Sequence, residues 1–157
     1  KEEYLKILPM LKEKQRKTNE EQVEFFKSHR GIKILFSKLL KNTKKGDVYR
    51  TFAVEDPELY REARERAFRF MKFLMDEKKI TARGIFHEKT REKKKKSTTI
   101  DKRYVSFPLP PNTLILNDKV AVISWVEEEP SGILIHSKDI ATKYVEFFES
   151  IWKLGKK

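Results

Sequence analysis

The C-terminal third of the chain constrains the fold most, because residues 112–152 contain three strand-like runs followed by an amphipathic helix. Apolar and β-branched residues typical of half-buried strands occur at Leu114, Leu116, Val120, Val122 and Trp125. Asn117 and Asp118 separate the first two runs and predict a tight turn, since Asx side chains bond their own backbone and tolerate left-handed dihedrals.

A third strand and a closing helix are predicted after an acidic turn. Pro130 interrupts residues 127–132, because proline lacks the donor that a strand ladder needs. Residues 132–136 then predict a short buried strand, and Ser137 is placed to cap the next helix with Asp139 in its first turn. The predicted core face of that helix consists of Ile140, Tyr144, Phe147, Phe148, Ile151 and Trp152.

The rest of the chain alternates strands and helices. Strands are predicted at residues 22–27, 48–54, 80–87 and 103–108. The segments that follow the first two of these strands carry apolar residues at helical spacing. Asp56 and Pro57 stand in the order typical of a helix start. This alternation predicts an α/β fold with a mixed, mostly parallel sheet and flanking helices.

A charged helix is predicted for residues 1–21, where Tyr4, Ile7, Leu8 and Leu11 form an apolar edge and Pro9 either interrupts the helix or marks its start. We interpret it as a linker or dimerisation helix, with residues 22–157 forming the folded domain. The alternative is an exposed tail that packs loosely on its own domain. Because the chain begins with Lys1 rather than Met, we expect it to be a fragment.

Composition limits the classes of function. The 157 residues suffice for one domain with a core, and the absence of cysteine excludes disulfides and thiolate metal sites, as suits a cytoplasmic protein. No apolar run reaches the roughly 20 residues of a membrane helix. The net charge of +12 favours anionic partners, although a surface rich in Lys and Glu, as in proteins from hot environments, is an equal alternative.

Residues 88–103 form a densely basic segment that includes Lys93, Lys94, Lys95 and Lys96. Like charges at this density repel one another and bury little surface, so the segment predicts a solvated loop or loose helix. These four lysines are candidate contacts for nucleic acid or another anion.

His87 and Lys89 form an H-x-K triplet at the end of a predicted strand. A nucleophilic histidine needs an orienting carboxylate and a second acid or base, and neither lies at useful spacing. We therefore predict no catalytic residue. The chain's widely spaced histidines predict no metal site, and no phosphate-binding glycine motif or other sign of a cofactor is present.

The order of pieces resembles the effector domain of TrmB-type archaeal transcriptional regulators. The resemblance covers residues 22–157 and depends mainly on the strand pair ILNDKVAVISW, the turn EEEPSGILIHS and the final FFESIWK. It implies a phospholipase-D-like fold without its catalytic pair, homodimerisation, and a winged helix-turn-helix that binds DNA outside this chain. Members of this family that respond to sugars suggest a sugar-type effector, whereas the basic segment would suit a small anionic one. No membrane partner is expected.

In an open α/β sheet, ligands bind beyond the carboxyl ends of the strands. Glu55, His87 and Lys89 fall there and are the predicted ligand-binding residues. Two alternatives remain open: a phosphodiesterase or nuclease of phospholipase-D type that uses His87 and Lys89, and a basic nucleic-acid-binding module that uses the four lysines.

Overall fold

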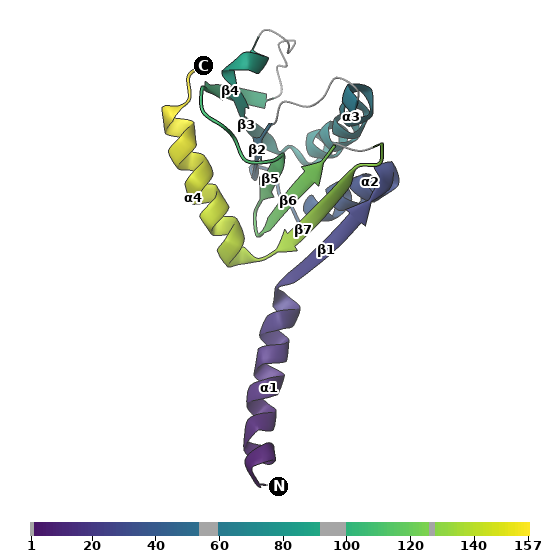
Figure 1. Ribbon diagram of the computed structural model, residues 1–157, viewed down its shortest axis with the longest axis vertical. Helices are drawn as coiled ribbons and strands as arrows, with labels where there is room; N and C mark the ends of the chain where they lie inside the picture. The colour runs from purple at the N-terminus through teal and green to yellow at the C-terminus, as the bar shows by residue number, and fades with distance from the viewer. Residues whose placement is uncertain (1, 54–59, 92–99, 126–127) are drawn as a thin grey trace.

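The computed structural model describes residues 2–53, 60–91, 100–125 and 128–157, without the side chains of residues 12–20 (Figure 1). Helices and strands alternate over most of this length. Their order is α1 (Glu2–Glu20), β1 (Gln22–Lys27), α2 (Ser28–Leu39), β2 (Val48–Phe52), α3 (Arg61–Lys78), β3 (Thr81–His87), the short 3₁₀ turn η2 (Glu88–Thr90), β4 (Ile100–Val105), β5 (Thr113–Leu116), β6 (Lys119–Ser124), β7 (Ser131–His136) and α4 (Lys138–Leu154).

The described strands form one seven-stranded sheet in the order β1-β7-β6-β5-β2-β3-β4. This confirms the predicted mixed α/β sheet with flanking helices. The expected predominance of parallel pairing is corrected: only β2–β3 and β3–β4 pair in parallel, and the other described neighbours are antiparallel. The alternation of strands and helices in the sequence did not show that β1 lies at the edge of the sheet beside β7. It also did not show that β5 pairs with β2.

The C-terminal block folds largely as its sequence predicts. Asn117 adopts a left-handed φ of 53° between β5 and β6, and the Ser137 hydroxyl accepts from the backbone N–H of Ile140 at 3.3 Å. The predicted core face of α4 is partly wrong, because Ile140 and Phe147 are exposed while Phe148 and Trp152 are buried. The buried stripe includes Ala141, whose small side chain lets the helix approach the sheet.

One predicted strand is shifted in the middle of the chain. The predicted strand at residues 103–108 is instead β4, three residues earlier, so β4 occupies the end of the segment predicted to be a solvated loop. The basic residues of β4 led to the prediction of a loop, but long charged side chains are compatible with a strand at the edge of a sheet. The predicted helix start at Asp56 and Pro57 lies outside the described residues.

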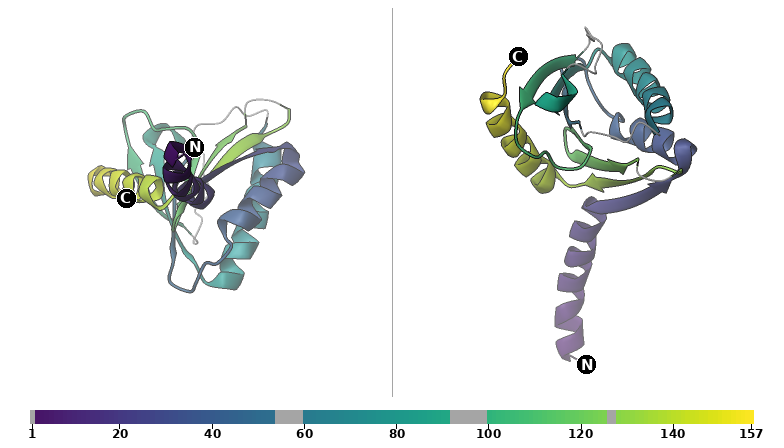
Figure 2. Two further views of the ribbon diagram at one scale, coloured as in Figure 1. Left: turned by 90° about the horizontal axis from the view of Figure 1, so that it is seen from below. Right: turned by 45° about the horizontal axis from the view of Figure 1, so that its top comes forward.

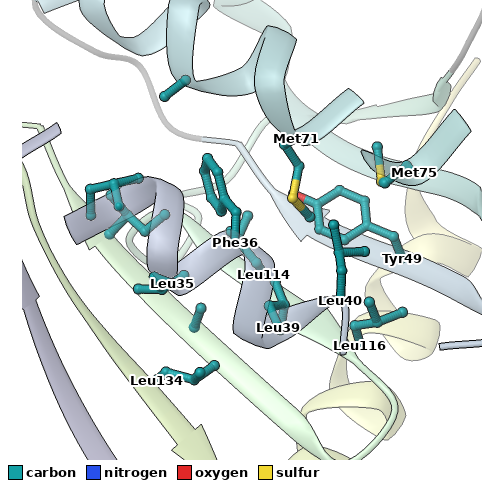
Figure 3. Close-up of a cluster of buried hydrophobic side chains, with 14 of the residues drawn as sticks. Leu35, Phe36, Leu39, Leu40, Tyr49, Met71, Met75, Leu114, Leu116 and Leu134 are labelled. Carbon is teal, nitrogen blue, oxygen red and sulfur yellow. The ribbon is translucent and has the colours of Figure 1, made fainter. Parts of the chain in front are cut away.

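Two apolar cores occupy the two faces of the sheet. One lies between the sheet and helices α2 and α3, and Figure 3 shows its Phe36, Leu39, Tyr49, Met71 and Leu114 side chains in mutual proximity. The other lies under α4, which packs mainly on β5 and β6. Helices thus cover both faces of the sheet, as in a three-layer α/β domain.

Helix α1 projects away from this body (Figures 1 and 2). It runs continuously through Pro9 and joins β1 through the single residue Glu21. The apolar side chains of its first eleven residues are largely exposed. No described helix is long and apolar enough to cross a membrane.

Candidate functional site

The predicted ligand site lies at the carboxyl ends of the parallel strands β3 and β4. His87 is the last residue of β3, and Lys89 follows in η2. Val105, the last residue of β4, is the cross-strand partner of His87. Glu55 and the four lysines at positions 93–96 lie outside the described residues, so their roles stay predictions.

The His87 side chain caps the turn that follows β3. Its Nδ1 accepts from the backbone N–H of Lys89 at 3.2 Å, and the Thr90 hydroxyl donates to the His87 carbonyl at 2.7 Å. Within the H-x-K triplet, the histidine thus contacts the backbone of the lysine.

A hollow of about 290 Å³ lies next to this turn. Its walls combine aromatic and aliphatic residues with one serine, one lysine and one glutamate, Glu88, whose carboxylate also pairs with Arg91 at 3.3 Å. The lining residues are Glu88, Tyr104, Val105, Ser106, Phe107, Leu154 and Lys156. Its volume is close to the lower limit for small-molecule sites, and charges of both signs would suit a small polar ligand.

The C-terminal residues complete the hollow. Tyr104 and Lys156 exchange two backbone hydrogen bonds, at 2.8 and 3.0 Å, which lay the C-terminal tail along the outer edge of β4. Arg103 strengthens this attachment: its guanidinium stacks 4.6 Å from the centre of the Trp152 ring and donates to the Trp152 carbonyl at 2.6 Å. Sequence reasoning missed Phe107, Leu154 and Lys156, because no local pattern brings residue 156 to residue 104.

A second polar cluster joins β1, β7 and α2. The two carboxylate oxygens of Glu24 bind different partners: Oε1 pairs with the Lys38 ammonium, and Oε2 lies 2.8 Å from Nε2 of His136. The hydrogen bond from Lys38 is the main cause that lowers the pKa of Glu24, and the bond with His136 contributes in the same direction. No sequence motif pointed to this cluster, because its members are far apart in the chain.

This cluster brings an imidazole, an ammonium and a carboxylate together, which are the groups of acid–base catalysis. Both Glu24 oxygens are occupied, however, and the neighbouring Ser137 hydroxyl donates to Glu21 Oε1 at 3.1 Å while capping α4. These contacts hold β1 against β7 and α2, whereas a substrate could bind Glu24 only by displacing one of its present partners. We therefore assign it a structural role.

The described residues contain no group of three or more His, Asp or Glu side chains that could hold a metal ion.

The sheet order and its flanking helices define a phospholipase-D-like α/β fold. No family model and no curated protein matches the sequence. Among solved structures, the chain is similar to TrmBL2, an archaeal chromatin protein, with a TM-score of 0.58 and 11% identity over 99% of this chain. It spans 66% of the TrmBL2 chain, or just under two thirds.

Two bacterial proteins share the fold. Nuc from Salmonella typhimurium, a phospholipase D family member, gives a TM-score of 0.55 at 14% identity, over 87% of this chain and 97% of its own. NucT from Helicobacter pylori gives 0.62 at 10% identity, over 87% and 98%. Identities this low establish the fold alone.

Proposed function

We propose that this chain is the ligand-sensing and dimerisation domain of a TrmB-type transcriptional regulator, whose winged helix-turn-helix lies outside residues 1–157. The observation that carries the proposal is the extent of the structural match. TrmBL2 matches 99% of the chain, α1 included, whereas Nuc and NucT match 87%. Residues 22–157 make up 136 of 157 residues, or 87%, which is the share expected if α1 has no counterpart in those two proteins.

Residues 1–21 then form the linker helix, and residues 22–157 form the sensing domain. A helix that leaves the body at a sheet edge is suited to carry a DNA-binding domain. TrmBL2 is described as a chromatin protein with a novel mode of DNA binding, which supports DNA as the partner of the whole regulator. On this proposal the protein acts in the cytoplasm.

The ligand would occupy the hollow next to the turn that contains His87 and Lys89. Neither of these two predicted residues lines the hollow, and Glu88 and Lys156 are its charged lining residues. The proposed effector is a small anionic or sugar-type molecule. Helix α4 is placed to transmit its binding: Leu154 at one end lines the hollow, and Ser137 at the other end contacts Glu21, the residue between α1 and β1. A ligand that favours one position of α4 would shift the population of α1 orientations.

A thermal-shift screen of small anions and sugars tests the sensing role. A ligand at 100 times its Kd stabilises the folded state by about 2.7 kcal/mol, which raises the melting temperature by several degrees. Phe107→Trp, which fills the hollow, should abolish the shift, while Phe73→Trp on the exposed face of α3 should retain it. A ligand that stabilises both variants equally binds elsewhere and contradicts the assignment of the hollow.

The second candidate is a phosphodiesterase or nuclease of phospholipase-D type, favoured by the fold shared with Nuc and NucT. It requires His87 to leave its capping bond and act as the nucleophile. Hydrolysis of a phosphodiester substrate by the unmodified chain, lost in His87→Ala, would establish this function instead. No turnover over a panel of nucleic-acid and lipid phosphodiesters supports the regulator.

A further inference from the structure

The exposed apolar side chains are concentrated at one end of the molecule. More than half of the large apolar residues that are exposed among the described residues belong to residues 4–25. They are Tyr4, Leu5, Ile7, Met10 and Leu11 on α1, and Val23 and Phe25 on β1. Clustered exposed apolar residues of this kind mark an interaction surface.

Val23 and Phe25 lie on the α4 side of the sheet. Glu24 and Phe26 alternate with them and face α2, where Glu24 binds Lys38 and Phe26 joins the core. Helix α4 packs mainly on β5 and β6 and leaves the Val23 and Phe25 side chains largely uncovered. Val23 and Phe25 remain 68% and 61% exposed. Figure 1 shows α4 extending to one side of the sheet, with only its N-terminal end next to β7.

The cross-strand partners of these residues extend the apolar face. Val23 pairs with Ile135 and Phe25 pairs with Ile133, and paired residues project to the same side of a sheet. The Glu24 cluster on the opposite side fixes β1 in this orientation. Ile135 also packs against the core under α4, so the part of this face that no described helix covers is the strip at Val23 and Phe25.

The two edge strands of the sheet, β4 and β1, differ in whether their outer edge is paired. The outer edge of β4 pairs with Lys156 of the C-terminal tail. β1 has a neighbouring strand on one side only, among the strands that the structure describes. Unprotected edges with apolar side chains are association sites.

The chain's own α1 cannot cover this strip. α1 ends at Glu20 and β1 begins at Gln22, so one residue joins them. A reversal that lays a helix back on the strand needs a longer loop, whereas α1 continues away from the body (Figure 1). The exposed apolar residues of α1 and those of β1 therefore belong to the same chain but cannot pack against each other within it.

We propose that α1 of a second copy packs on the Val23–Phe25 face of β1 and β7, and that the contact is reciprocal. This rests on the dimerisation proposed above and specifies its surface. The exposed apolar residues of α1 lie within residues 4–11, a length of about 11 Å, which matches about half of the roughly 20 Å of β1 and covers the roughly 7 Å, or two residues of strand, between Val23 and Phe25. Seven side chains that each bury on the order of 100 Å² give about 700 Å² per copy, close to the roughly 800 Å² of a stable interface.

Disulfide trapping tests the arrangement cleanly, because the chain has no cysteine of its own. Met10→Cys and Phe25→Cys are made separately, mixed and oxidised. The proposal expects a mixed Met10–Phe25 dimer at least tenfold faster than either single variant forms a disulfide with itself. Lys72→Cys, on the exposed face of α3, replaces Phe25→Cys in the control mixture and should not cross-link.

Three results are distinguishable. Cross-linking of Met10→Cys only with itself would overturn the reciprocal contact in favour of α1 pairing with α1, and leave the dimerisation proposed above intact. A dimer in light scattering that gives neither cross-link also overturns it. A monomer at high concentration would overturn both, whereas the ligand screen tests sensing independently.

A substitution that should leave the fold intact provides a second test, the dissociation constant of the dimer. Phe25→Glu lies on exposed surface, so circular dichroism should be unchanged, while the dimer dissociation constant should rise at least tenfold. Phe73→Glu, also exposed but on α3, is the matched control and should leave dissociation unchanged. An equal effect of both variants, or none from Phe25→Glu, would count against the β1 face.

Discussion

Glu24 of β1 and His136 of β7 bind each other at 2.8 Å across the first strand pair of the sheet. The same carboxylate binds Lys38 of α2, so one side chain ties the edge strand to its neighbour and to the helix above it. Because α1 enters the domain through β1, this cluster also determines where the proposed linker helix is anchored.

Stability should depend on the ionisation of Glu24. Its pKa in the folded protein is lower than the ordinary value of 4.5, so the stabilisation is present above that pH and is lost as the pH falls through the folded pKa. Glu24→Gln should lower the free energy of unfolding by about 1 kcal/mol at pH 7. Urea unfolding at pH 7 and pH 3 measures both effects, and the difference between the two proteins should be smaller at pH 3. An equal difference at both pH values would contradict this.

Gly132→Ala should destabilise the packing of α2 on β7. A Cβ at this position would lie 2.8 Å from Leu35 Cδ1 and 3.2 Å from Ile32 Cδ1, both fully buried. We expect a loss of about 1–3 kcal/mol in chemical denaturation. Gly31→Ala is the control, because its Cβ would meet only ordinary contacts at 3.6–3.7 Å within a helix, and it should be neutral or stabilising.

Phe148→Ala and Phe147→Ala compare two neighbouring rings on α4. Phe148 is fully buried and lies 5.2 Å from the Phe52 ring, so its removal should cost about 3–5 kcal/mol. Phe147 is 48% exposed, and its removal should cost clearly less in the same thermal and urea unfolding experiments. Equal losses would mean that the helix is rotated from the position described.

Ser137→Ala removes both the cap of α4 and the contact with Glu21. The lost cap should cost about 1 kcal/mol of stability. We also expect faster amide hydrogen exchange at the end of α1, because its junction with β1 loses one restraint. Ser150→Ala on the exposed face of α4 is the control and should change neither measurement. If amide hydrogen exchange at the end of α1 is unchanged in Ser137→Ala, the proposal that α4 transmits ligand binding to α1 is wrong.

The sequence alone predicts much of the fold, particularly where the signal is local. Periodicity and turn residues located β5, β6, β7 and α4, because an Asx turn, a proline and a capping serine act within a few residues of where they stand. The resemblance drawn from the same block led to the phospholipase-D-like fold, which the structural matches confirm. The predicted core face of α4 was partly wrong, since Phe147 and Phe148 both fit the helical period but only Phe148 is buried.

Only the tertiary structure decided which distant segments meet. It placed β1 at the edge beside β7, closed the hollow with Lys156 against Tyr104, and joined Glu24 to His136 across 112 positions of sequence. Strand order, tail docking and a shared carboxylate depend on the summed packing of the whole sheet, and no local pattern encodes that sum. The sequence by itself therefore determined the elements and the absence of cysteine chemistry, while the arrangement of the candidate surfaces came from the packing of seven strands against helices on both faces.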